Sequence, residues 1–263
     1  MKNIILSQIT TECPWRDTLY WYDTIDSTNT RAKELAAQGA SHGTVLIADH
    51  QTGGRGRLGR SFHSPAGCGI YLSVLLRPKC KAAQLMHLTC AVATAVCDGV
   101  EKCCGFRPGV KWINDLVANN KKLGGILTEM SLDAAGNAEY CVIGIGLNCK
   151  KIPLPQELRD IAVSLEEACG APVDRASLIC GILAALKEMD TGLLSQKSER
   201  MEKYRKDCVT LGKDVLVLRQ DQSLPGTALD VDDEGGLLVR FCDGSQQTVN
   251  AGEVSVRGMY GYL

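Results

Sequence analysis

Three strand-like runs near the middle of the chain, at residues 110–114, 122–131 and 139–149, constrain the fold most because only short segments separate them. The connecting segments carry turn residues, at Asn119-Asn120 and at 135–137 (Ala-Gly-Asn). Parallel strands need crossovers of a dozen or more residues, so neighbours joined this closely should form antiparallel hairpins. The chain therefore predicts a mostly antiparallel sheet.

Segments with helical patterns alternate along the chain with these strands. The larger part of the chain is therefore predicted to be an α+β domain. Capping residues at 26–29 precede a helical stretch that stops at Gly39. A long glycine-rich loop at 50–67 separates two apolar strands. Helices are predicted at 31–37, 82–104, 161–169, 174–189 and roughly 195–211, and further strands at 44–49 and 69–77.

The pattern of the sequence changes from helical segments to short strand-like runs at Gly212. Short β-branched runs follow at 215–218, 237–241, 247–249 and 254–257. Turn signals separate them at Pro225-Gly226, 234–236 and 243–244, a pattern typical of a small all-β barrel. We therefore predict an α+β domain over 1–211 and a small β-barrel domain over 212–263.

Composition narrows the classes of protein. The formal net charge of −1 lacks the basic excess of a dedicated nucleic-acid binder. No run approaches the ~18 apolar residues of a membrane helix, and the N-terminal apolar stretch is too short for a signal sequence. The 13 cysteines contain no C-x-x-C pair, which favours buried thiols in a reducing compartment. We expect a cytoplasmic protein with no nucleic-acid or membrane partner.

The segment at 51–60 (QTGGRGRLGR) is the most unusual in the chain. Its glycines let backbone N–H groups approach a ligand, and Arg55, Arg57 and Arg60 bring permanently charged donors suited to phosphate or carboxylate. It lacks the pattern of a phosphate-binding P-loop. Phosphate binding is the favoured interpretation; an RNA-binding Arg/Gly element and a solvated loop stay open.

Polar residues interrupt three of the predicted strands. The segments at 111–115 (KWIND), 122–129 (KLGGILTE) and 144–148 (GIGLN) combine charged or amide side chains with glycines that leave room for a neighbour. Each alone is compatible with an ordinary strand end. Together with the loop, they provide four cations that could neutralise two reacting anions: Arg55, Arg57, Lys111 and Lys122. This favours the activation of a carboxylate by ATP.

These motifs, preceded by Ser27-Thr28-Asn29 and in this order, resemble the biotin–protein ligase family. The resemblance runs from about residue 20 to the C-terminus. It implies a class II synthetase-like catalytic domain followed by an SH3-like barrel. It also implies that biotin and ATP form biotinyl-5′-AMP, and that biotin passes to a lysine of a biotin carboxyl carrier protein or domain.

The resemblance further implies roles for individual residues. Lys122 and Arg57 would be catalytic, and Asp115 would contact Mg²⁺. Contacts to ATP would come from Arg55, Arg57, Phe62, Lys111, Asn114, Asp115 and Asn148. Contacts to biotin would come from Ser27, Thr28, Asn29, Gln51, Gly54, Arg55, Gly56, Arg57, Lys122 and Gly125.

Two positions depart from the family pattern. Ile113 stands where proline is common, which alters the turn before Asn114 and Asp115, and Phe62 stands where tryptophan is common. Regulatory members carry a winged helix-turn-helix, for which the roughly 26 residues before Ser27 are too few, so we expect a ligase without repressor activity. A homodimer stays open.

Two rival functions are kept. A lipoate ligase or octanoyltransferase would share the fold, but its apolar ligand does not need the polar residues Ser27, Thr28 and Gln51. A non-catalytic RNA- or ligand-binding module would use the Arg/Gly loop without ATP turnover.

Overall fold

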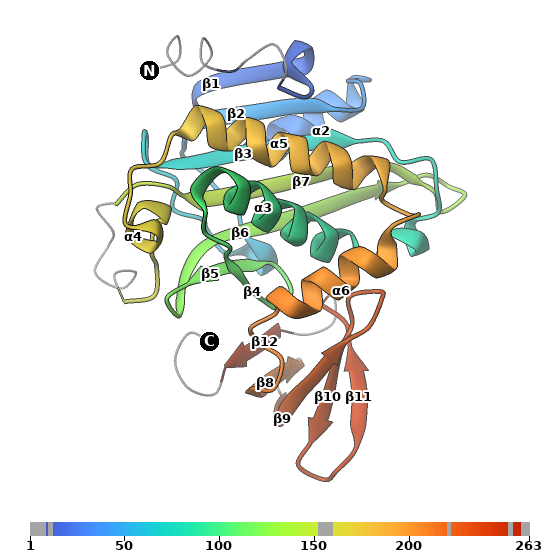
Figure 1. Ribbon diagram of the computed structural model, residues 1–263. Helices are drawn as coiled ribbons and strands as arrows, with labels where there is room; N and C mark the ends of the chain where they lie inside the picture. The colour runs from blue at the N-terminus through green and yellow to red at the C-terminus, as the bar shows by residue number, and fades with distance from the viewer. Residues whose placement is uncertain (1–8, 10–12, 152–159, 220–221, 252–254, 259–263) are drawn as a thin grey trace.

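A computed structural model describes the chain except for residues 1–8, 10–12, 152–159, 220–221, 252–254 and 259–263. A seven-stranded sheet forms its centre, in the order β1-β2-β3-β7-β6-β5-β4 (Figure 1). Its strands are β1 (Leu19–Ile25), β2 (Thr44–Gln51), β3 (Gly69–Leu76), β4 (Gly109–Lys111), β5 (Asp115–Ala118), β6 (Lys121–Leu132) and β7 (Ala138–Asn148).

The predicted antiparallel hairpin between 122–131 and 139–149 is confirmed, whereas β4 pairs with β5, a strand that was not predicted and that lies between β4 and β6. β6 pairs antiparallel with both β5 and β7. Asn119 and Asn120, between β5 and β6, have φ values of 50° and 58°, the left-handed conformation that a tight two-residue hairpin requires. The predicted strand at 110–114 is only partly correct, because β4 ends at Lys111 and β5 begins at Asp115. The peptide bond between Trp112 and Ile113, in the turn between them, is cis.

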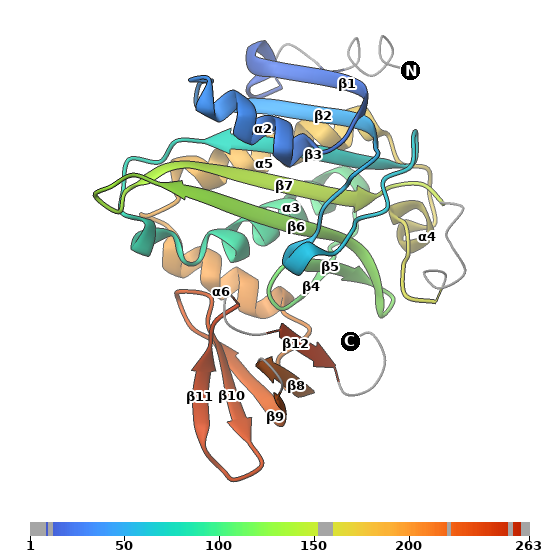
Figure 2. The ribbon, with the colours of Figure 1, turned by 180° about the vertical axis from the view of Figure 1, so that it is seen from behind.

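One strand pair is parallel, which was not predicted from the sequence. β1 pairs parallel with β2, and helix α2 (Thr28–Ala37) connects them. Helix α2 lies on the opposite face of the sheet from the other long helices, as Figure 2 shows. Ser27 caps α2, as the sequence predicted, although its hydroxyl lies a long 3.5 Å from the backbone N–H of Thr30.

Helices α3 (Leu88–Cys104) and α5 (Arg175–Thr191) cover the other face and bury the main core (Figure 1). The short helices are η1 (Arg16–Thr18), η2 (Arg57–Gly59), η3 (Ala82–Leu85) and α4 (Leu165–Cys169). A buried ion pair joins α5 to β2: Arg175 Nη2 lies 2.9 Å from Asp49 Oδ1.

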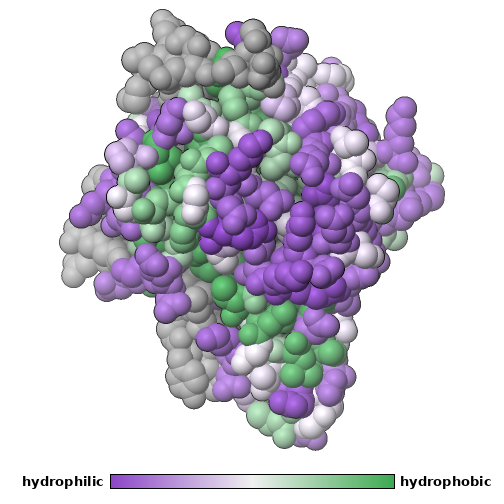
Figure 3. All heavy atoms as spheres, viewed as in Figure 1, coloured by the Kyte–Doolittle hydropathy of each residue, from purple (hydrophilic) through white to green (hydrophobic). Residues whose placement is uncertain are grey.

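One expectation about membranes needs correction. Residues Ala82–Cys104 are long and apolar enough to span a membrane, contrary to the prediction that no run approaches this. However, 72% of the apolar window is buried inside the fold. Hydrophilic side chains lie on the outer surface of helix α6 (Lys197–Asp207), which packs beside α3 (Figure 3). Packing in the core therefore accounts for the apolar character of this segment.

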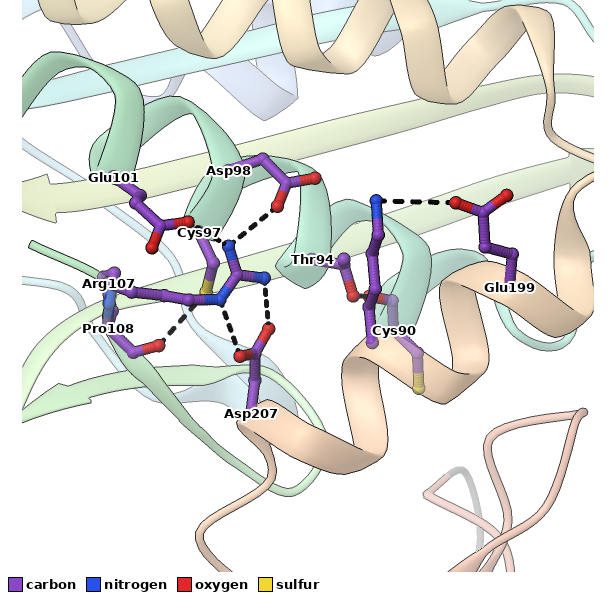
Figure 4. A network of polar contacts seen from close by, with 10 residues as sticks. Cys90, Thr94, Cys97, Asp98, Glu101, Arg107, Pro108, Glu199 and Asp207 are labelled. Carbon is purple, nitrogen blue, oxygen red and sulfur yellow. Dashed lines mark hydrogen bonds and ion pairs between the residues drawn. The ribbon is translucent and has the colours of Figure 1, made fainter.

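Helix α6 (Lys197–Asp207) leads from the main sheet to the C-terminal strands. Arg107, just after α3, donates to Asp98 and Glu101 of α3 and, through two nitrogens, to Asp207 at the end of α6 (Figure 4). The three carboxylates raise the pKa of Arg107, since hydrogen bonding to Asp207 favours its charged form. This network holds α3 and α6 together.

The C-terminal strands form a second sheet in the order β11-β10-β9-β8-β12. They are β8 (Asp214–Arg219), β9 (Gln222–Val231), β10 (Leu237–Phe241), β11 (Gln246–Val249) and β12 (Ser255–Gly258). The predicted turn at Pro225-Gly226 is wrong, because both residues lie inside β9 and Gly226 allows close approach of β10. The described residues form an open sheet, so closure into a barrel and the boundary at 211/212 stay predictions.

Candidate active site

A cavity of about 820 Å³, its open mouth included, lies on the face of the main sheet that carries α2. The loop between β2 and β3 crosses this face (Figure 2). The cavity is lined by the N-terminus of α2, by that loop and by residues of β5, β6 and β7. Its two ends differ in chemistry.

One end is polar and uncharged. Gln51, the last residue of β2, accepts the backbone N–H of Thr28 at 2.8 Å and lies 3.1 Å from its hydroxyl oxygen. The amide nitrogen of Gln51 donates to Ser64 at 3.1 Å, so the carboxamide is oriented by the protein. Ser27 and Thr28 are buried and line the same end. These groups suit a small polar ring that both donates and accepts hydrogen bonds.

Asn29 lies above β7, where Gly144 leaves space. A Cβ atom on Gly144 would come within 2.1 Å of Asn29 Oδ1. The carboxamide of Asn29 is used inside the protein, since its nitrogen donates to Glu129 at 2.9 Å and its oxygen lies 2.6 Å from Ser73 Oγ. The glycines of this strand predicted the close approach of a ligand or a backbone, whereas at Gly144 the close neighbour is a side chain of the protein.

Gly146 accommodates Phe62 in the same manner. A Cβ atom there would lie 2.6 Å from the ring of Phe62, which also contacts Tyr71 edge-on. Phe62 lines the cavity next to Gly146 of β7. The GIGLN motif therefore provides two spaces in the sheet, one for α2 and one for the loop.

The other end of the cavity is cationic. Lys122 Nζ donates to Asp115 Oδ1 at 2.6 Å, and a Cβ atom on Gly125 would lie 3.6 Å from that nitrogen. Arg57 donates to Asn114 Oδ1 at 3.2 Å and to the carbonyl of Ala251, beyond β11, at 2.5 Å. The arginine loop is thus attached both to the main sheet and to the C-terminal part of the chain.

The charge on Arg57 is held in a partly buried position. Desolvation lowers its pKa, against the opposing effect of the nearby Asp115 carboxylate. A guanidinium keeps its proton despite such a shift, so the cost of burial favours an anion that enters the cavity. Arg55 and Arg60 line the cavity too and are exposed.

The structure gathers most of the predicted site residues around this cavity. Three of them lie elsewhere among the described residues. Gly54 packs under Gln51 and Ser64, Asn148 is buried and donates to the carbonyl of Val163, and Lys111 pairs in register with Asp115 without lining the cavity. Those lining it are Ser27, Thr28, Asn29, Gln51, Arg55, Gly56, Arg57, Phe62, Asn114, Asp115, Lys122 and Gly125.

Sequence reasoning missed Ser73. This serine is fully buried on β3 and contacts both Thr28 and Asn29. Its signal in the sequence is a lone polar residue within the otherwise apolar strand GIYLSVLL.

A resident metal site is not formed by the described residues, which contain no cluster of three potential metal-binding side chains. Asp115 is the one carboxylate among the described residues that line the cavity. Magnesium often takes one or two protein carboxylates and completes its shell with substrate phosphates and water. The donor set therefore fits an ion that arrives with a nucleotide.

Comparison with known proteins identifies the family of the chain. Residues 21–148 match the Biotin/lipoate A/B protein ligase family, and residues 210–257 match the Biotin protein ligase C terminal domain. The bifunctional ligase/repressor BirA of Bacillus subtilis is 35% identical over 236 residues, which cover 89% of this chain and 72% of BirA. The chain belongs to the biotin protein ligase family.

Two further relatives support the assignment. The biotin–[acetyl-CoA-carboxylase] ligase of Mycobacterium tuberculosis is 35% identical over 234 residues, covering 87% of this chain and 85% of that protein. The biotin protein ligase of Aquifex aeolicus, solved with biotin and ATP, superimposes with a TM-score of 0.77 at 30% identity, covering 91% of this chain and 98% of that one. The predicted family and the α+β fold are thereby confirmed.

Proposed function

We propose that the chain is an ATP-dependent biotin–protein ligase that forms biotinyl-5′-AMP and transfers biotin to a lysine of a biotin carboxyl carrier protein or domain. The observation that carries this is a single cavity with a neutral polar end, at Thr28 and Gln51, and a cationic end, at Arg57 and Lys122. Biotin has the same polarity, with a ureido ring at one end and a carboxylate at the other.

In the first step, a carboxylate oxygen of biotin attacks the α-phosphorus of ATP, and pyrophosphate leaves. Both reactants are anions, so they must be brought together against their mutual repulsion. Lys122, oriented by Asp115, is assigned to neutralise the carboxylate and the α-phosphate, and Arg57 to stabilise the charge of the adenylate. Asp115 would hold Mg²⁺ beside the nucleotide, and the ion would supply further charge neutralisation.

In the second step, the neutral amine of the acceptor lysine attacks the carbonyl carbon of the mixed anhydride. AMP leaves with its electron pair, an amide bond forms, and the nitrogen loses a proton. Contacts of Arg57 with Asn114 and with the carbonyl of Ala251 keep the loop over the cavity. We assign this closure to the protection of the adenylate from water.

The test is exchange of labelled pyrophosphate into ATP, with biotin, lipoate and octanoate supplied separately. Exchange with biotin alone is expected. Exchange with lipoate or octanoate alone would refute the substrate and retain the chemistry, whereas no exchange with any acid would refute adenylation. Transfer of labelled biotin to an isolated carrier domain, and its loss when the acceptor lysine is replaced by arginine, tests the second step.

A further inference from the structure

Lys122 lies near the start of β6, beyond the point where β7 accompanies that strand. The pairing of β6 with β7 begins at Gly124, and β7 ends at Asn148. The place of β7 beside Lys122 is taken by residues 161–164, which we call the strap and which form a parallel bridge to Lys122. A helix was predicted from residue 161 onwards, but α4 begins only at Leu165, so the strap is left to pair with the sheet.

The strap binds both backbone hydrogen-bonding groups of Lys122. The N–H of Lys122 donates to the carbonyl of Ile161 at 2.7 Å, and its carbonyl accepts the N–H of Val163 at 2.9 Å. At the far end of the side chain, Nζ donates to Asp115 Oδ1 at 2.6 Å. Because the four-carbon stem of a lysine is flexible, its charged end is placed accurately only when both the backbone and Nζ are held.

Two buried polar side chains hold the strap in turn. Asn148, at the end of β7, donates from Nδ2 to the carbonyl of Val163 at 3.2 Å. Ser164 forms a capping box with Glu167 at the N-terminus of α4: its hydroxyl donates to Glu167 Oε2 at 2.7 Å and accepts the N–H of Glu167 at 3.3 Å. Asn148 is 6% exposed and Ser164 2%, so water is a poor replacement for either side chain. Neither is among the described residues that line the cavity.

We infer that Asn148 and Ser164 are positioning residues, which hold the strap and through it the backbone of Lys122. The inference rests on the proposed function, because adenylation is the step that requires Nζ to meet the carboxylate and the α-phosphate together. Misplacement of a reacting group by about 1 Å can cost about a hundredfold in rate. The inference also gives Asn148 a role other than the contact to ATP that the family resemblance implies.

The first experiment measures biotin-dependent pyrophosphate exchange in Ser164→Ala and Asn148→Ala. Each change should lower kcat about tenfold and leave the KM values for biotin and ATP within about twofold, because the placement of Lys122 is lost and substrate contacts are kept. Ser177→Ala is the matched control: it removes a serine hydroxyl that donates to Asp174 at the N-terminus of α5 instead of α4, and it should keep the kcat of the unaltered chain. A raised KM for ATP with kcat retained in Asn148→Ala would restore its contact to ATP and overturn its positioning role.

A double-mutant cycle asks whether the two residues act through Lys122. In the Lys122→Ala background the amine to be positioned is absent, so Ser164→Ala and Asn148→Ala should lower the residual kcat by less than about twofold. A full, independent loss in that background would show a general disturbance of the site and refute the role.

A readout besides activity is the exchange of the Lys122 N–H with deuterium, followed by NMR. This N–H is protected while the strap accepts it, so Ser164→Ala should speed its exchange about tenfold or more, whereas the amides of β3 should exchange as in the unaltered chain. Unchanged exchange at Lys122 would overturn the inference, whatever the kinetics show.

Glu167 offers the same test at an exposed position if Ser164→Ala does not fold. Glu167→Ala removes one half of the capping box, whereas Glu167→Gln keeps an acceptor oxygen for Ser164. The first change should lower kcat by about threefold or more, and the second should retain it. Equal kcat values in the two variants would refute a link between the capping box and Lys122.

The outcomes separate this inference from the proposed function. If the unaltered chain shows no biotin-dependent exchange, the proposed function fails. If the unaltered chain exchanges normally, but the variants keep its kcat and its protection of the Lys122 N–H, the function stands and the positioning role falls.

Discussion

Gly144→Ala is the substitution whose effect follows most directly from the geometry. The added methyl group would lie 2.1 Å from Asn29 Oδ1, whereas ordinary van der Waals contact begins near 3.4 Å. Asn29 would have to move by more than 1 Å, yet it is buried and held by Ser73 and Glu129. The N-terminal turn of α2 would therefore be pushed off the sheet.

The magnitude combines two costs. Overpacking of a buried position costs about 1–3 kcal/mol, and each weakened hydrogen bond adds about 1 kcal/mol. We expect Gly144→Ala to lower the free energy of unfolding by about 2–4 kcal/mol. Thr28, next to Asn29, would shift as well, so KM for biotin should rise about tenfold or more, which corresponds to ~1.4 kcal/mol of binding.

Urea unfolding and biotin-dependent pyrophosphate exchange measure these two effects. Gly53→Ala is the matched control, because a Cβ atom there meets no atom closer than 3.4 Å. The control should change KM less than twofold. If Gly144→Ala unfolds at the urea concentration of the unaltered chain and keeps its KM, the tight contact with Asn29 is refuted as a constraint on the site.

Three other predictions address separate parts of the molecule. Asp49→Ala would leave Arg175 buried without its partner and should destabilise the fold by ~3–5 kcal/mol in urea unfolding. Glu202→Ala, at an exposed helix pair, should leave the urea midpoint nearly unchanged, and equal effects of the two substitutions would contradict the importance of the buried pair. Burial disfavours the charged form of Glu129, but hydrogen bonds to the carboxylate outweigh it and lower its pKa, so its contribution to stability is present above its ordinary pKa and is lost as pH falls through the lowered value. Glu129→Gln should therefore flatten the loss of stability below about pH 4.5, and an unchanged acid limb would argue against the ionised form. Lys122→Ala should reduce adenylation at least a hundredfold while direct binding of biotin is weakened far less, and near-normal exchange would remove Lys122 from the mechanism.

The sequence by itself determined the hairpin of β6 and β7, the long helices, the positive charge of the loop and the family. These are local properties. Asn119-Asn120 needs only its own backbone preference to predict a tight turn, and the arginines at 55 and 57 carry their charge in any fold. The motifs also keep their order and spacing along the chain, and these two properties are enough to indicate the family.

Other features depended on contacts between residues far apart in the chain. The parallel strand β1 and the extended β9 were missed, because neighbouring strands decided their conformation and overrode local signals such as Pro225-Gly226. The hydrogen bond from Arg57 to the carbonyl of Ala251 could not be predicted either, because the two residues are 194 positions apart in sequence.

The division of the site residues into those that line the cavity and those that support it is also a tertiary property. In the sequence, Asn29 and Gly144 are both candidates for ligand contact, and Ser73 is one serine within an apolar strand. The sheet brings Ser73 opposite Gly144, and α2 places Asn29 above both. A buried polar side chain must find its hydrogen-bond partners within the protein. The tertiary structure therefore decides which polar side chains are used in such bonds and which remain available to a ligand.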